Sequence, residues 1–156
     1  MNVVVLIFPP SASTSRRALA RSIRGLDIRI SNEGGCIICE GRDPTKLASR
    51  LANLAGADIT TIARKVPSRF SSITNAIVQA GSETILPDEK FYVKVIQQAA
   101  KADYVDRDIE FASTGALVGK LAEINALPAK SEQEADRVIL AIVGKKSAYI
   151  CVKDMT

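Results

Sequence analysis

The sequence contains no histidine and no tryptophan, and only 4% of its residues are aromatic. Histidine is the commonest general base and the commonest metal ligand, so its absence excludes Ser-His and Cys-His dyads and most zinc sites. Cys36, Cys39 and Cys151 are too few, and odd in number, for a disulfide framework. We therefore expect no enzyme activity, no metal and no cofactor.

Long apolar segments are also lacking. The opening run Val3 to Phe8 is too short to cross a bilayer, has no basic flank before it and meets Pro9-Pro10. We expect no signal peptide, no contact with a membrane and a cytoplasmic location. With 156 residues, 47% of them apolar, the chain can form one ordinary domain or two small ones.

The net charge of +4 is spread unevenly. Residues 1–66 hold ten Lys and Arg against five Asp and Glu, whereas residues 67–156 hold eleven against twelve. Such asymmetry is typical of a local surface that faces phosphates, but solubility alone explains it equally well.

The first half of the chain combines strand and helix patterns with stop signals between them. The expected elements are a strand, a helix, a two-stranded hairpin, a second helix and a last strand, at residues 2–8, 14–24, 26–30 with 36–40, 44–55 and 58–66. Asp43 before Pro44 supplies the cap of the second helix. The order β-α-β-β-α-β predicts a ferredoxin-like module over residues 1–66.

The second half predicts another α/β module, over residues 67–156, so the chain as a whole has an α+β fold. Its expected elements are a helix, a strand, a helix and a closing hairpin, at residues 71–81, 91–96, 113–125 and 137–143 with 148–152. Ser113 or Thr114 is the expected cap of the second of these helices.

Three patterns resemble reactive sites, and each has a simpler interpretation. The pair Cys36 and Cys39 lies in a strand, where this spacing points two side chains to opposite faces, so we expect ordinary packing. Gly115 and Gly119 precede Lys120 without the spacing of a phosphate-binding loop. The start of that helix could still hold one phosphate oxygen, although a simple cap is favoured.

Carboxylates gather in an expected polar loop over residues 100–110. Acids at this spacing can bind Mg²⁺ or transfer protons, but no nucleophile lies near them and solvated loops often look the same. We favour the solvated loop over a catalytic site for these four residues: Asp103, Asp106, Asp108 and Glu110.

Basic residues form the clearest functional pattern. Arg17, Arg21 and Arg24 occur at i, i+4 and i+7 and make one stripe on the expected first helix. Like charges on one face repel, so the stripe is favoured where a polyanion lies against it; a solvated face is the alternative. The full set of predicted RNA-contacting residues is Arg17, Arg21, Arg24, Arg64, Lys65, Arg69, Lys94, Lys120, Lys145 and Lys146.

Base readout on a strand surface is disfavoured, because the strand Cys36 to Glu40 carries none of the aromatic residues that RRM domains use for stacking. Recognition of the RNA backbone and shape remains.

The order of modules resembles the N-terminal ferredoxin-like domain and THUMP domain of tRNA 4-thiouridine synthetases and other tRNA-modifying enzymes. The resemblance is diffuse and hydrophobic, and covers most of the chain, through residues 36–66, 91–95, 108–124 and 135–152. It implies binding of the tRNA acceptor-stem region and its 3′ end. Two departures stand out: no nucleotide-binding catalytic domain or sulfur-carrying domain accompanies the modules, and Gln97-Gln98 replace a basic pair.

The sequence thus predicts a non-catalytic, archaeal-type tRNA-binding subunit that presents tRNA to a separate modifying enzyme, for thiolation or a similar reaction. Three alternatives stay open: a ferredoxin-like regulator that binds a small molecule, an enzyme that uses the carboxylates of residues 103–110, and a fragment of a longer tRNA-modifying enzyme.

Overall fold

The computed structural model describes residues 2–7, 28–33, 36–51, 59–97 and 106–155. The chain divides into two compact units, Met1–Arg64 and Lys65–Thr156. The sequence placed the module boundary after Val66, two residues later than this division. No helix in the described part of the chain is both long and apolar enough to cross a membrane.

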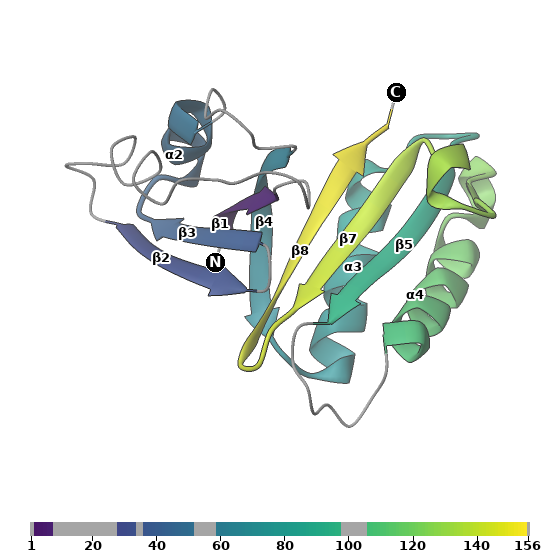
Figure 1. The fold of residues 1–156 in the computed structure, drawn as a ribbon. Helices are drawn as coiled ribbons and strands as arrows, with labels where there is room; N and C mark the ends of the chain where they lie inside the picture. Colours follow the sequence, from purple (N-terminus) through teal and green to yellow (C-terminus); the bar gives the residue numbers. More distant parts are fainter. Residues whose placement is uncertain (1, 8–27, 34–35, 52–58, 98–105, 156) are drawn as a thin grey trace. The chain divides into compact units, whose positions relative to one another are not determined.

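The first unit contains four strands, all neighbours antiparallel, with one helix among its described residues. Its elements are β1 (Asn2–Ile7), β2 (Ile28–Glu33), β3 (Cys36–Gly41), α2 (Pro44–Leu51) and β4 (Ile59–Pro67), the last continuing into the second unit (Figure 1). The strands lie in the order β2-β3-β1-β4. Strand β3 is antiparallel to both β1 and β2, so β1 and β2 run parallel with β3 between them. Strands in this order and with these directions occur in the split βαβ arrangement. The helix expected over residues 14–24 lies outside the described residues, so the ferredoxin-like module stays a prediction.

Helix α2 begins as predicted. The Asp43 carboxylate accepts a hydrogen bond from the Lys46 backbone N–H at 3.1 Å, and Pro44 occupies the first helical position, where no N–H is needed. Leu47 faces inward and is buried.

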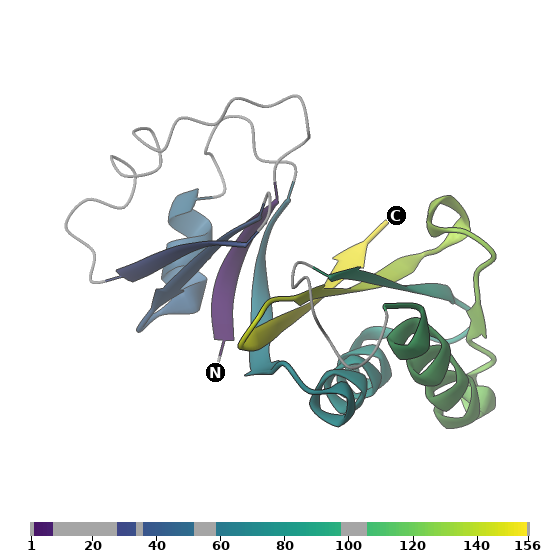
Figure 2. The same ribbon diagram turned by 60° about the horizontal axis from the view of Figure 1, so that its bottom comes forward.

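The second unit is a mixed sheet covered by two helices. Its elements are α3 (Phe70–Thr84), β5 (Lys90–Gln97), α4 (Asp106–Lys120), η1 (Ala122–Ile124), β6 (Leu127–Pro128), η2 (Glu132–Glu134), β7 (Arg137–Val143) and β8 (Ser147–Asp154). The strand order is β8-β7-β5-β6, with β7 and β8 antiparallel and β5 parallel to both β7 and β6. Helices α3 and α4 lie side by side on one face of this sheet (Figures 1 and 2).

The core of this unit lies between the helices and the sheet. Alternate residues of β5, including Phe91 and Val93, pack against Ile77 of α3 and Leu117 of α4 within one buried cluster. The burial of alternate positions in β5 follows from the strand period of two. The other face of β5 carries Lys94, which is only partly buried.

The extent of α4 corrects the sequence prediction. We expected a loop up to residue 110 and a helix from Ser113 to Asn125, but the helix spans Asp106–Lys120. Ile109 and Leu117 are fully buried two turns apart, and Ser113 lies buried between them. Ile109 therefore belongs to the buried stripe of the helix, and the acidic first turn favours the helix through its dipole.

Candidate nucleic-acid interface

The start of α3 is joined to the turn between β7 and β8. The Ser68 backbone N–H donates to the Lys146 carbonyl at 3.2 Å, and the Ser68 hydroxyl donates to the Gly144 carbonyl at 2.8 Å. The Gly144 N–H closes the turn on the Ser147 carbonyl at 2.9 Å. Two segments more than 70 positions apart in sequence are thus held together at one end of the sheet.

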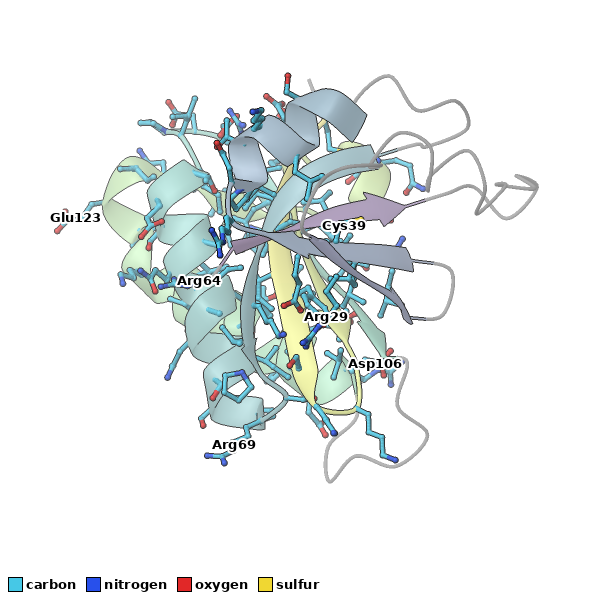
Figure 3. All side chains as sticks on the ribbon, turned by 90° about the vertical axis from the view of Figure 1, so that its left-hand side faces the viewer. Arg29, Cys39, Arg64, Arg69, Asp106 and Glu123 are labelled. Atoms are coloured by element: carbon cyan, nitrogen blue, oxygen red, sulfur yellow. The ribbon has the colours of Figure 1, made fainter. Side chains whose placement is uncertain are left out.

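Four basic residues belong to this junction, and we call them the α3 cationic end: Lys65, Arg69, Lys145 and Lys146. Arg69, Lys145 and Lys146 are exposed, and Lys65 is half-buried three residues before Ser68. Figure 3 shows Arg69 extending outward from the start of α3.

The backbone and the sequence around this end increase its positive potential. The first turn of α3 carries no acidic residue, and residues 65–74 and 143–149 contain no Asp or Glu. Helix N-termini present unpaired N–H groups and a partial positive charge. Arg69 caps α3 without a side-chain hydrogen bond, so the first N–H groups of the helix receive no side-chain acceptor from this cap residue. The combination suits a phosphate group.

The remaining predicted contacts lie elsewhere. Lys94 forms an ion pair with Glu132 at 3.0 Å on the side of β5 away from the helices. Lys120 is the last residue of α4, and Asp88 bonds to Ile124 just beyond it, at the end of the sheet where β5 begins. The α3 cationic end lies where β7 ends, so Lys120 is at the opposite end of the unit. Arg64 is exposed on β4 in the first unit.

The arginine stripe of the first half, Arg17, Arg21 and Arg24, lies outside the described residues. The sequence prediction named Arg69, Lys145 and Lys146, which the structure places near one another, but it did not name Ser68, which brings their segments together. A serine before a helix suggests a cap, whereas this hydroxyl bonds to a carbonyl 76 positions away. No local pattern signals such a bond.

The patterns that resembled reactive sites have structural explanations. Cys39 is a buried free thiol on β3, and burial raises its pKa to about 11, so it is not a reactive thiolate at neutral pH. Ser113 lies inside α4 and not at its N-terminus, which overturns the phosphate site considered there. The Cβ positions of Gly115 and Gly119 have no neighbour within 4 Å.

The set of acidic residues predicted to lie in a loop is only partly in one, because Asp106 and Asp108 belong to the first turn of α4. Glu110 accepts a hydrogen bond from the Val95 N–H at 3.0 Å. Asp103 lies outside the described residues. Within the described ranges, no group of three or more Cys, Asp and Glu side chains is arranged to hold a metal ion.

No protein-family model and no curated protein matches the chain. Solved structures do match. PH1313 from Pyrococcus horikoshii has a TM-score of 0.77 at 19% identity, over 98% of this chain and 54% of that one. A 4-thiouridine synthetase in complex with RNA and ATP has a TM-score of 0.74 at 13% identity, over 98% of this chain and 41% of that one.

TrmN from Thermus thermophilus has a TM-score of 0.64 at 13% identity, over 100% of this chain and 46% of that one. The chain therefore spans about half the length of these proteins, or less. At such identities the likeness concerns the fold. The fold is α+β and THUMP-like, as the sequence resemblance implied.

Proposed function

We propose that this chain binds tRNA through the α3 cationic end and presents it to a separate modifying enzyme in the cytoplasm, without making or breaking covalent bonds itself. The observation that carries the proposal is the junction of Ser68 with the Gly144–Lys146 turn, which gathers basic side chains around a helix N-terminus. The likeness in fold to a 4-thiouridine synthetase that binds RNA supports it.

The mode of recognition follows from the chemistry of these groups. Lys and Arg side chains and helix N–H groups bind phosphate oxygens, which are the same at every nucleotide. Such contacts position RNA by its backbone and shape, and they do not read its sequence. A partner enzyme must then supply both the choice of base and the reaction.

The salt dependence of tRNA affinity tests this surface. Each neutralised phosphate contributes roughly −0.7 to −0.9 to the slope of log affinity against log salt, so three contacts contribute a slope of about −2 to −3. We expect the variant Arg69→Ala/Lys145→Ala/Lys146→Ala to lose about that much slope in titrations of labelled tRNA from roughly 50 to 200 mM salt.

A matched control removes the same charge at the other end of the unit. Lys90 and Lys130 are exposed and Lys153 is half-buried at the end of the sheet where β5 and β7 begin, and the variant Lys90→Ala/Lys130→Ala/Lys153→Ala should retain most of the slope. Equal losses in the two variants would mean that net charge, and not the α3 cationic end, determines binding. A change in nucleoside mass after incubating tRNA with the purified chain alone would overturn the non-catalytic role.

A further inference from the structure

Strand β5 has an incompletely paired edge. On one side it pairs with β7 along its whole length, but on the other it pairs with β6 only at Lys90 and Phe91. The Lys90 carbonyl accepts a hydrogen bond from the Asp136 backbone N–H on the β7 side. The Phe91 carbonyl accepts one from the Ala129 backbone N–H on the β6 side. The direction of backbone groups alternates along a strand, so odd-numbered residues of β5 face the edge.

Two of these odd-numbered residues have partners and the one between them does not. Phe91 bonds to the β6 segment, and the Val95 N–H donates to the Glu110 carboxylate at 3.0 Å. Val93 lies between them with its N–H and carbonyl directed past the end of β6, and no hydrogen bond joins either group to a described residue on this side. An unpaired donor and acceptor in strand register form a template for another strand.

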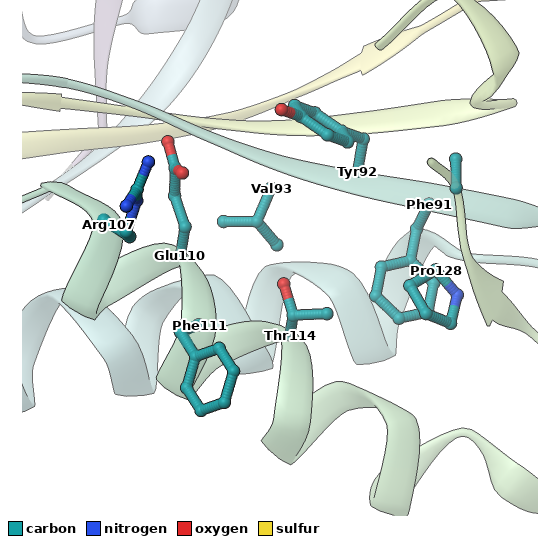
Figure 4. A pocket seen from close by; sticks show the side chains of 9 residues that line it. Phe91, Tyr92, Val93, Arg107, Glu110, Phe111, Thr114 and Pro128 are labelled. Carbon is teal, nitrogen blue, oxygen red and sulfur yellow. The ribbon is translucent and has the colours of Figure 1, made fainter. Parts of the chain in front are cut away.

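A pocket of about 240 Å³ opens in front of this gap. Figure 4 shows the Thr114 side chain of α4 pointing toward Val93, with Phe111 of α4 to one side of the pocket and Pro128 to the other. The Phe111 side chain is 82% exposed, the most exposed of the large apolar residues described. The gap in the sheet edge therefore lies beside an apolar surface that water covers in the free chain.

We propose that the β5 edge binds an extended peptide segment of a partner protein, which adds a strand at Val93. A peptide carbonyl accepts from the Val93 N–H, and a peptide N–H donates to the Val93 carbonyl. An apolar side chain of the peptide packs between Phe111 and Pro128.

The local charge indicates the kind of peptide. Arg107 and Glu110 both line the pocket, and Asp106 and Asp108 stand on either side of Arg107 in the first turn of α4, so residues 106–110 hold three acidic side chains against one basic side chain. Negative charge thus exceeds positive charge here, which favours a segment with Lys or Arg beside its apolar residue. The same excess repels phosphate, so RNA fits this edge poorly and fits the α3 cationic end better.

Hydrogen exchange tests the open edge in the free chain. Amides bonded within a sheet exchange slowly, so we expect the Val93 amide to exchange at least about tenfold faster than those of Tyr92 and Lys94, which face β7. The Val95 amide should be protected by Glu110 and should exchange faster in the variant Glu110→Ala. Protection of Val93 equal to that of its two neighbours would overturn the proposal.

Binding is tested with a displayed library of random linear twelve-residue peptides, selected against the full chain. Selected peptides should carry an apolar residue beside Lys or Arg, shift the Val93 amide resonance and slow its exchange. The variant Phe111→Ser should lower the affinity of these peptides by about fivefold or more, roughly 1 kcal/mol. Methylation of the peptide N–H that pairs with Val93 should lower it as well. Val118, also on α4 and exposed, is the matched control, and Val118→Ser should bind normally.

Other outcomes reject the peptide. An added strand would be excluded if no selected peptide shifts the Val93 amide resonance, or if methylation of the peptide backbone leaves peptide affinity unchanged. If only RNA oligonucleotides shift this resonance, the edge binds RNA. Because Phe111→Ser leaves the α3 cationic end intact, its tRNA affinity should be unchanged. Failure of the peptide proposal and failure of the proposed tRNA function are therefore distinguishable.

Discussion

The Ser68 hydroxyl donates a hydrogen bond of 2.8 Å to the carbonyl of Gly144, 76 positions later in the chain. Together with the bond from the Ser68 N–H to the Lys146 carbonyl, it attaches the β7–β8 turn to the start of α3. Arg69 follows Ser68 directly, so the same bonds set its position relative to Lys145 and Lys146.

Replacing Ser68 with alanine should loosen this junction. The change removes one partly buried hydrogen bond and leaves the Gly144 carbonyl without that donor, so we expect the free energy of unfolding to fall by about 1 kcal/mol. Urea titration measures it. The exposed Ser71 is the matched control, and Ser71→Ala should change the stability by less than about 0.5 kcal/mol. Equal effects would show that the Ser68 bond contributes little.

A second prediction concerns the contact between α3 and α4. A Cβ atom at Gly81 would lie 2.7 Å from Leu117 Cδ2 and 3.2 Å from its Cδ1. Leu117 is fully buried and has little room to move, so Gly81→Ala should destabilise the chain by about 1–3 kcal/mol despite the higher helix propensity of alanine.

Gly115 provides the control for this substitution, because open space surrounds its Cβ position. Gly115→Ala should raise the free energy of unfolding by about 0.5–1 kcal/mol through helix propensity alone. Thermal and urea unfolding distinguish the two variants by sign. A stabilising Gly81→Ala would mean that the Leu117 side chain adjusts without cost.

A third prediction concerns Ser113, whose side chain is fully buried in α4 with no hydrogen-bond partner for its hydroxyl oxygen. A buried hydroxyl without a partner loses its hydrogen bonds to water and forms none within the protein. Ser113→Ala should therefore stabilise the chain by up to about 1 kcal/mol. The higher helix propensity of alanine acts in the same direction.

Exposed Ala116, one turn further on, separates these contributions when Ala116→Ser is measured by urea unfolding. The fall in the free energy of unfolding caused by Ala116→Ser estimates the contribution of helix propensity. The rise caused by Ser113→Ala should be larger than this amount. A destabilised Ser113→Ala variant would indicate that the hydroxyl has a hydrogen-bond partner in solution.

A fourth prediction follows from the buried thiol on β3. Burial raises the pKa of Cys39 from 9.0 to about 11, so the folded chain retains a proton that the unfolded chain releases. Stability from this group is fully present below pH 9 and is lost as the pH rises toward 11. The loss should reach about 1 kcal/mol by pH 10.

Other groups titrate in the same range, so the measurement compares the wild type with Cys39→Ala. Urea unfolding at intervals between pH 8 and pH 10.5 should show a steeper decline for the wild type. Parallel pH profiles would mean that the thiol ionises as readily in the folded chain as in the unfolded one.

Local signals in the sequence were sufficient to predict most of the helices and strands. The cap at Asp43 and the apolar positions of α3, such as Ile73 and Ile77, mark their helices because they depend on residues within one or two turns. The predicted start of α4 was wrong because polar residues dominate the first turns of this helix. Ile109 alone marks the buried side there, and only its place in the core reveals it.

The sequence by itself determined the α+β class, the resemblance to a THUMP-like fold and the lack of histidine chemistry, since these depend on composition and short-range periodicity. The tertiary structure alone decided which basic residues share one end of the second unit, and that no described strand pairs with the β5 edge at Val93. Both depend on contacts between distant segments, where a single hydrogen bond or the length of a neighbouring strand settles what no local pattern encodes.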